Sequence, residues 1–338
     1  MATVVSTDLT TSISPSPDAT QSFYDREMLT RAKYAELYGR FADVSNLKKK
    51  QGKTVIMRRW AHLALALSPL AEGIAPTGKK PTLTDYQATL KQFGDFIVLS
   101  DYADLTGIDD YQTFWVGLLG EQAGYTIDAV DRDVVTAGTN VFYSNGAART
   151  DVVSIIDEND LDRAIRSLAR NGGQSMLAGN SGSTNVGSTP IMAAYPAITS
   201  PDVMFDLQNL DGFKWASDYR GAVEGEQARY KQLAFFPSAD PSSLNAGAKK
   251  FASGGGSSTA VQNSAGTVDV FTIMVMAKHG FTRVPLDGES TKNIRKALGS
   301  AGTADPLDQI QTFGWKNTSA RLITNQNWLA RIECAASL

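Results

Sequence analysis

The spacing of apolar residues predicts one long helix in the first half of the chain. From Asp109 to Ala137 the apolar positions recur with helical periodicity, and Gly138 fits the position that ends a helix. At 1.5 Å per residue this helix is roughly 40 Å long, which exceeds the usual globular helix and would let it cross the whole subunit. Its apolar stripe is expected to contain Tyr111, Phe114, Trp115, Leu118, Ile127, Val130, Val134 and Ala137.

Shorter helices are expected at three other places. Helical spacing covers residues 24–38, with Gly39 able to end the helix, and it recurs over residues 161–170. Ser200 stands directly before Pro201, which is the arrangement of an N-cap followed by proline in the first helical turn. A third short helix is therefore predicted to begin there.

Two strands joined by a long excursion are predicted before the long helix. Residues 54–60 and 86–100 alternate between apolar and polar positions, as strands do. The 25 residues between them, 61–85, contain several prolines and glycines. Connections of this length are uncommon in compact domains and usually have a function of their own. Further strands are expected at 190–195, 229–236 and 268–276 and within 310–332.

The first twenty residues differ in composition from the rest of the chain. Nine of them are Ser or Thr and none is aromatic, so this segment cannot bury enough surface to order itself alone. Residues 171–189 and 253–266 are rich in small and polar residues and are expected to be loops. The sequence thus predicts a polar N-terminal arm followed by folded segments with flexible connections.

Composition and charge exclude several classes of protein. The 338 residues include 32 Lys and Arg against 35 Asp and Glu, a net charge of −3, which excludes a strongly basic nucleic-acid binder. The length suggests two or more domains. Cys334 is the single cysteine, so no intrachain disulfide is possible. The longest apolar stretch, 61–71, is far shorter than the ~20 residues needed to span a bilayer, so we expect a soluble protein of a reducing cytoplasm.

No catalytic constellation can be assembled from the sequence. Residues 73–80 match the spacing of a phosphate-binding loop as far as Lys79, but Lys80 replaces the hydroxyl residue that would bind magnesium, and no βαβ pattern surrounds the segment. The two histidines, His62 and His279, are 217 positions apart, which excludes a histidine-rich metal centre. We therefore predict no catalytic, metal or cofactor site and no enzyme activity.

The acidic residues of the long helix are not expected to form a catalytic site. Asp128, Asp131 and Asp133 are too close together on one helix to frame a substrate as paired carboxylates. Asp128 and Arg132 stand four residues apart, so they are expected to form a surface ion pair worth a few tenths of a kcal/mol.

Several stretches carry a resemblance to a known family. They are residues 92–96 (QFGDF), 201–207 (PDVMFDL), 305–309 (DPLDQ), 314–316 (GWK) and 325–333 (NQNWLARIE). In this order, and over most of the chain from about residue 20, the sequence resembles the major capsid proteins of tailed bacteriophages, and more narrowly the coliphage N4-type family. None of the stretches is diagnostic alone, and the first twenty residues and 253–266 are less typical of that family.

The resemblance implies an α+β fold of the HK97-like capsid type. It places an N-terminal arm at 1–50 and an extended loop, a β-hairpin, at 51–100. It implies a peripheral domain with the long spine helix at 101–155 and 305–338, and an axial domain at 156–304. Subunits of this kind assemble into hexamers and pentamers of an icosahedral phage head around double-stranded DNA.

The resemblance also implies partners and a location. The chain would bind further copies of itself, together with scaffolding, decoration and portal proteins, and would enclose DNA without sequence specificity and without a membrane. It would be part of the virion and would assemble in the cytoplasm of the bacterial host. Two alternatives stay open: an encapsulin-like bacterial nanocompartment shell, and an α/β enzyme that uses the Gly73–Lys80 loop.

The excursion supplies the residues expected to contact other subunits. A two-stranded ribbon has little core of its own, so leucines beyond it would be exposed in a free subunit and available to a neighbour. The lysines near its tip could meet acids on the long helix of another copy, each such pair adding at most about 1 kcal/mol. The candidate contact residues are Leu63, Leu65, Leu67, Leu70, Lys79, Lys80, Asp128, Asp131 and Asp133.

Overall fold

The computed structural model describes most of the chain. The described residues are 26–32, 36–67, 69, 72–73, 75, 77–108, 110–179, 192–219, 221–238, 250–256, 260–264, 266–287, 291–300, 302 and 305–338. The polar arm over the first twenty residues and Leu70 lie outside these ranges. The chain forms two compact units: unit 1 takes residues 1–35, 93–124 and 291–317, and unit 2 takes 36–92, 125–290 and 318–338.

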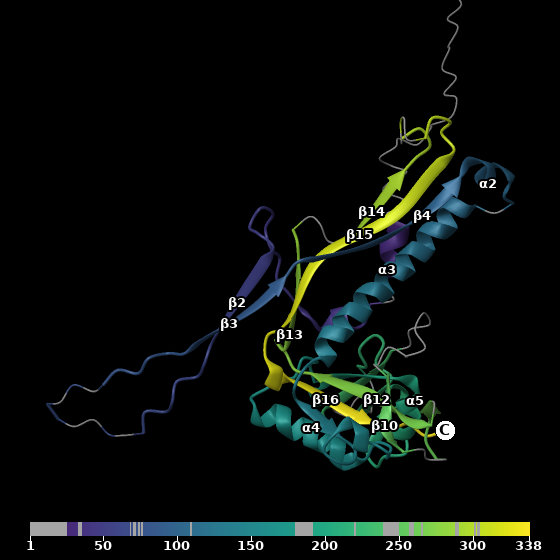
Figure 1. Cartoon of the computed structure of the whole chain (residues 1–338). Helices are drawn as coiled ribbons and strands as arrows, with labels where there is room; N and C mark the ends of the chain where they lie inside the picture. The colour runs from purple at the N-terminus through teal and green to yellow at the C-terminus, as the bar shows by residue number, and fades with distance from the viewer. Residues whose placement is uncertain are drawn as a thin grey trace, which may run out of the picture. The chain divides into compact units, whose positions relative to one another are not determined.

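The predicted long helix is confirmed as α3, Tyr111–Thr136, which supplies residues to both units (Figure 1). Its buried face differs from the expected stripe, because Phe114 and Leu118 are exposed. The buried apolar side chains of α3 are Val116, Leu119, Ala123, Ile127 and Val135.

Glycine explains which face of α3 is buried in unit 1. A helical segment at residues 26–32 packs against α3, and a Cβ on Gly120 would lie 2.6 Å from the carbonyl oxygen of Met28. Such a distance is shorter than van der Waals contact, so the close approach requires glycine. The small residues, rather than the large aromatic ones, therefore determine where the neighbouring helix can lie.

Three strands of a five-stranded sheet cover the other buried side of α3 in unit 1. They are β4 (Lys91–Ser100), β14 (Thr291–Lys296) and β15 (Ile310–Ile323). β15 pairs with both of the others, and through its second half it continues into unit 2. The core of this unit consists of Met28, Leu99, Val116, Leu119, Ala123, Phe313 and Trp315. A short helix, α2 (Asp101–Thr106), follows β4 directly.

The predicted strand at 86–100 is in fact two strands. β3 (Leu83–Thr89) pairs antiparallel with β2 (Thr54–Trp60), whereas β4 pairs with β15. The chain changes sheets at Leu90, where alternation of apolar and polar residues continues on both sides. A pattern of period two shows that a strand is present but not which strand it pairs with, so the sequence could not separate the two.

The larger sheet lies in unit 2. Within its described residues the order is β5-β16-β12-β6-β9-β8-β7, and β10 and β11 also pair with β12. The strands are β5 (Val141–Tyr143), β6 (Tyr195–Thr199), β7 (Phe213–Trp215), β8 (Ala228–Tyr230), β9 (Leu233–Pro237), β10 (Lys250–Gly256), β11 (Asn263–Ser264), β12 (Thr267–Met276) and β16 (Leu329–Cys334). β12 is buried along nearly its whole length, as its continuous apolar run predicts.

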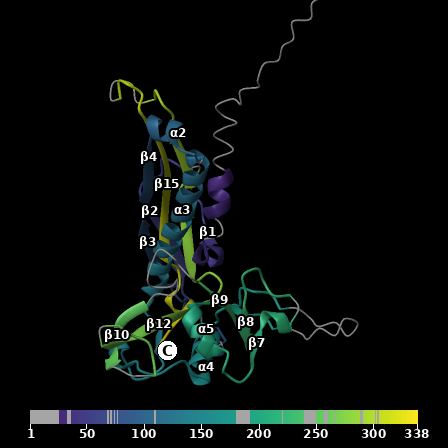
Figure 2. The same cartoon turned by 90° about the vertical axis from the view of Figure 1, so that its right-hand side faces the viewer.

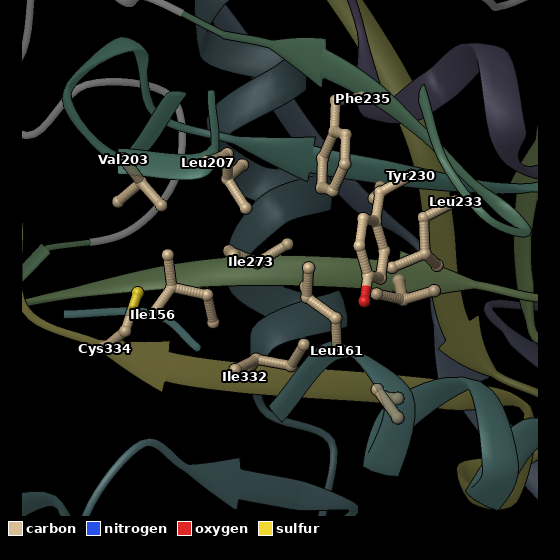
Figure 3. Packing of buried hydrophobic residues seen from close by; sticks show 14 of the residues in the cluster. Ile156, Leu161, Val203, Leu207, Tyr230, Leu233, Phe235, Ile273, Ile332 and Cys334 are labelled. Atoms are coloured by element: carbon tan, nitrogen blue, oxygen red, sulfur yellow. The ribbon is translucent and has the colours of Figure 1, made fainter. Parts of the chain in front are cut away.

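Two helices cover the larger sheet (Figures 1 and 2). They are α4 (Glu158–Arg170), which contains the predicted helix at 161–170, and α5 (Pro201–Leu207). The hydroxyl of Ser200 accepts a hydrogen bond from the backbone N–H of Val203, so the predicted cap is confirmed. Figure 3 shows the core between these helices and the sheet, where Cys334 is fully buried. Burial raises the pKa of its thiol, as expected for an inert cysteine.

Short elements complete unit 2. They are β1 (Asp43–Val44), β13 (Phe281–Pro285) and the 3-10 helices η1 (Tyr38–Phe41), η2 (Arg149–Asp151), η3 (Ala216–Asp218) and η5 (Gln326–Trp328). Gly39 lies inside η1 and does not end the preceding helix, contrary to expectation. The predicted strand at 190–195 is displaced to β6, and the one at 229–236 is divided into β8 and β9 by a turn at Lys231, whose φ is 47°.

The glycine contact in unit 1 makes a stability prediction. Gly120→Val should destabilise the subunit by roughly 1–3 kcal/mol, because its Cβ would collide with the backbone of Met28, which cannot rotate away. Gly117→Val is the matched control, since a Cβ there would meet only the flexible end of the Arg31 side chain. If denaturant unfolding shows that both variants lose the same free energy of unfolding, the prediction is wrong.

Candidate subunit-contact surfaces

The excursion between β2 and β3 is an open segment with exposed leucines. β2 and β3 pair from Thr54 opposite Thr89 to Trp60 opposite Leu83, and Figure 1 shows the chain continuing beyond this ribbon and returning to it. Among the described leucines of the excursion, exposure runs from 58% for Leu63 to 84% for Leu67. These leucines are available to another molecule, as the sequence suggests.

Lys79 closes the excursion on itself. Its Nζ donates hydrogen bonds to the carbonyl oxygens of Ala64, at 2.7 Å, and Leu65, at 2.9 Å. Lys80 is exposed. Residues 77–82 contain no helix, so the phosphate-loop interpretation lacks the helix N-terminus that such a loop needs.

Asp128 is buried, which corrects the expected surface pair with Arg132. Its Oδ1 accepts hydrogen bonds from the backbone N–H groups of Leu37 and Tyr38, both at 2.7 Å. Burial raises the pKa of the Asp128 carboxyl to about 7, although the two backbone hydrogen bonds act in the opposite direction. The carboxyl therefore fastens the start of η1 to α3, and it is not accessible to a lysine of another subunit.

Asp131 is also buried, at the centre of a charge cluster that comprises Glu36, Asp131, Arg283 and Arg321. Arg283 of β13 and Arg321 of β15 are directly opposite in the sheet register. Like charges at such positions repel, and the Asp131 carboxylate neutralises them by binding both guanidinium groups. Arg283 also binds Glu36 at 3.0 Å.

Of the three acids predicted as lysine acceptors, Asp133 alone is exposed. Its side chain is 56% exposed and lies 3.9 Å from the Arg132 guanidinium, whereas Asp128 and Asp131 are buried. Sequence reasoning missed this because the partners of Asp131 lie on β13 and β15, more than 150 positions along the chain. Spacing within one helix carries no information on such neighbours.

Two further apolar surfaces of unit 1 were missed by sequence reasoning. One lies on α2 and the start of α3, where Tyr102, Leu105, Ile108, Phe114 and Leu118 are exposed. The other is the face of β4, β14 and β15 that points away from α3, which exposes Phe96, Val98, Ile294 and Ile310. Their apolar character is visible in the sequence, but an apolar residue of a strand or helix is normally assigned to the core.

The described residues offer little catalytic chemistry. A pocket of about 230 Å³ in unit 2 is lined by Pro201, Met204, Phe205, Trp215, Gln227 and Pro237. This lining contains no titratable side chain. Among the described residues, no group of three or more His, Cys, Asp or Glu could hold a metal ion. A search of the same residues for a helix long and apolar enough to cross a bilayer finds none.

Titration of Asp128 should make stability depend on pH. Because the pKa is higher in the folded state than in the unfolded chain, the folded state binds the extra proton between about pH 4 and 7. Stability from this group therefore falls as pH rises through that window, by at most about 1.4 kcal/mol per pH unit, and is flat above it. Asp128→Asn keeps an oxygen acceptor and should lack this contribution. If the free energy of unfolding changes by the same amount between pH 5 and pH 8 in the wild type and in Asp128→Asn, the assignment is wrong.

Removing the Asp131 charge should destabilise the subunit strongly. Asp131→Asn leaves Arg283 and Arg321 opposed without their common carboxylate, and breaking a buried ion pair costs about 3–5 kcal/mol. Asp133→Asn, two residues along the same helix and exposed, should cost less than about 0.5 kcal/mol. Chemical denaturation measures both, and similar losses for the two variants would refute the role of the cluster.

Comparison with solved structures identifies the fold. A chain from the capsid of cyanophage P-SCSP1u is 13% identical, with a TM-score of 0.57 and 89% of each chain covered. A chain from the capsid of cyanophage Pam1 is 9% identical, with a TM-score of 0.58 and 86% of each chain covered. The capsid of Ralstonia phage GP4 gives 11% identity and a TM-score of 0.57, covering 89% of this chain and 92% of that chain.

No protein-family model and no curated protein matches the sequence. The structural likeness nevertheless extends over nearly the whole chain and includes both units. At such low sequence identity a shared architecture establishes the fold rather than the function. The chain therefore has the α+β, HK97-like fold found in the capsids of tailed phages.

Proposed function

We propose that this protein is the major capsid protein of a tailed bacteriophage, of the coliphage N4-type family. The observation that carries the proposal is structural likeness to phage capsid chains over 86–89% of this chain. On this proposal the subunits form hexamers and pentamers of an icosahedral head around double-stranded DNA. Assembly takes place in the cytoplasm of the bacterial host, and the mature protein resides in the virion.

The exposed apolar residues support this function. A monomeric protein rarely exposes a leucine-rich segment such as the excursion, and patches of this kind usually mark an interaction site. In this proposal Leu63, Leu65, Leu67 and Leu70 contact a neighbouring subunit, with Lys80 and Asp133 as peripheral charges. Lys79 contributes by holding the excursion closed through its two carbonyl contacts.

The proposal retains the division of the chain into an arm at 1–50, an extended loop at 51–100, a peripheral domain at 101–155 and 305–338, and an axial domain at 156–304. Scaffolding, decoration and portal proteins are the further partners it implies. The net charge of −3 suits a wall that encloses DNA without binding it tightly.

Electron microscopy of the expressed protein tests the proposal. Closed shells, formed by the chain alone or with a scaffolding protein, are the expected result, and native particles should contain DNA. Enzyme cargo in place of DNA would identify a nanocompartment shell of the same fold. A protein that stays monomeric under all conditions in analytical ultracentrifugation would rule out both.

The excursion should serve assembly rather than folding. Because Trp60 pairs with Leu83, an Asn-Gly turn can replace residues 61–82 and still close the ribbon. This variant should give a soluble subunit with a cooperative melt but no closed shells. Loss of folding would place the segment in the core, and normal shells would show that it is not an assembly contact.

A finer comparison separates leucines from lysines. A burial contribution of ~1.5–3 kcal/mol per leucine predicts that replacing Leu63, Leu65 and Leu67 by Ser abolishes shells. Replacing Lys80 by Ala should reduce their yield only slightly, since an exposed ion pair adds at most about 1 kcal/mol. Equal effects in quantitative electron microscopy would contradict the dominant role of the leucines.

A further inference from the structure

The uncovered face of the sheet in unit 1 combines apolar and basic residues. In each strand alternate residues point to opposite faces. Phe93, Leu99, Phe313 and Trp315 point toward α3, so the intervening residues point away from it. These outward residues include Phe96, 65% exposed, and the exposed Val98, Ile294 and Ile310.

The charge on this sheet face is positive. Lys292, Lys296 and Lys316 occupy outward positions, and Lys292 is directly opposite Lys316 in the register of β14 and β15. From Gly94 to Ser100 in β4, and at the outward positions of β14 and of β15 up to Lys316, no residue is acidic on this face. The exposed ammonium groups of Lys296 and Lys316 on this surface favour an acidic partner.

The α2–α3 surface of the same unit consists of the described residues 101–108 and 110–118 and is apolar and acidic. α2 buries no residue at all, and Tyr102 and Leu105 are 74% and 82% exposed. A helix of six residues is not stable by itself in water, and α2 is held within the subunit by its Ser100 cap, by Ala103 and by hydrogen bonds to Asp104. Its large apolar side chains take no part in these contacts and are available to a partner.

Charge on the α2–α3 surface is opposite to that of the sheet face. Residues 101–118 contain four acidic residues and no Lys or Arg. Asp101 and Asp110 lie among the exposed apolar residues of this surface. Unit 1 thus carries two surfaces that are both apolar and that differ in the sign of their charge.

We infer that the sheet face of one copy binds the α2–α3 surface of a second copy, an inference that rests on the proposed function. Two copies of the sheet face would repel each other, and so would two copies of the α2–α3 surface. A contact between different surfaces of identical subunits is heterologous and builds rings when the rotation closes. This contact would therefore join successive subunits of a capsomer.

The excursion is the competing occupant of the α2–α3 surface, because it is also apolar and basic. One of its two lysines is already engaged within the subunit, because Lys79 binds the carbonyl oxygens of Ala64 and Leu65, whereas Lys80 is exposed. The sheet face offers Lys296 and Lys316 together with a larger set of apolar side chains, so the charges favour it.

A charge exchange tests the pairing. Lys296→Glu with Lys316→Glu makes the sheet face negative. Asp101→Lys and Thr106→Lys with Asp104→Asn and Asp110→Asn make the α2–α3 surface positive, while the two amides keep oxygen acceptors at residue 104 and at the N-cap of α3. Each of the two multiple variants should reduce the shell yield at least tenfold, and the combination of all the changes should restore most of it. Lys214→Glu and Asp211→Lys, both exposed in unit 2, are the matched controls and should not change the yield.

Disulfide trapping supplies a second measurement. Cys334 is fully buried, so introduced cysteines react without background. Ile294→Cys with Leu105→Cys should give a ladder of linked subunits on non-reducing gels after catalysed air oxidation. Lys214→Cys with Leu105→Cys should not.

The outcomes distinguish the inference from the proposed function. If wild-type shells form and the sheet-face variants also form them normally without a ladder, the inference is overturned and the proposed function stands. Loss of shells only in the α2–α3 variant assigns that surface to another partner, such as the excursion, and also overturns the inference. A wild-type protein that never associates overturns both.

Discussion

The buried carboxylate of Asp131 connects four segments of unit 2. It binds Arg283 and Arg321, which are directly opposite in the sheet, and Arg283 in turn binds Glu36. Without this negative charge, pairing β13 with β15 would place two guanidinium groups side by side in a poorly solvated site. The register of those strands, the position of residue 36 and the place of α3 in the unit are therefore interdependent.

Asp128, one turn earlier on α3, adds a second attachment of a different kind. It accepts two backbone hydrogen bonds from the start of η1, which fixes the direction in which the chain enters that 3-10 helix. Burial makes the charged carboxyl costly, so the folded subunit is more stable when the group carries a proton, even though the two backbone hydrogen bonds favour the charged form. Two neighbouring carboxyl groups of α3 thus have different roles: Asp131 neutralises two guanidinium groups, and Asp128 binds two backbone N–H groups.

Unit 1 shows the consequence of a fold that does not bury all of its apolar residues. α3 presents its small residues to the neighbouring helix and leaves Phe114 and Leu118 exposed. α2 buries nothing, and one face of the sheet remains open. Exposed apolar area on this scale favours aggregation of an isolated chain, whereas in a shell the same residues would be buried in contacts between subunits. The fold and the proposed function agree on this point.

By itself the sequence determined the elements whose signals are local. The helical periodicity of α3, the apolar run of β12 and the Ser200 cap each depend on residues within a few turns or one strand, and the ordered resemblance to phage capsid proteins gave the fold class. Only the tertiary structure decided which strand pairs with which and which carboxylates are buried. Alternation cannot show that the chain changes sheets at Leu90, and helix spacing cannot place Arg283 and Arg321 beside Asp131. Those features arise from contacts between segments far apart in the chain, whose energies no local pattern records.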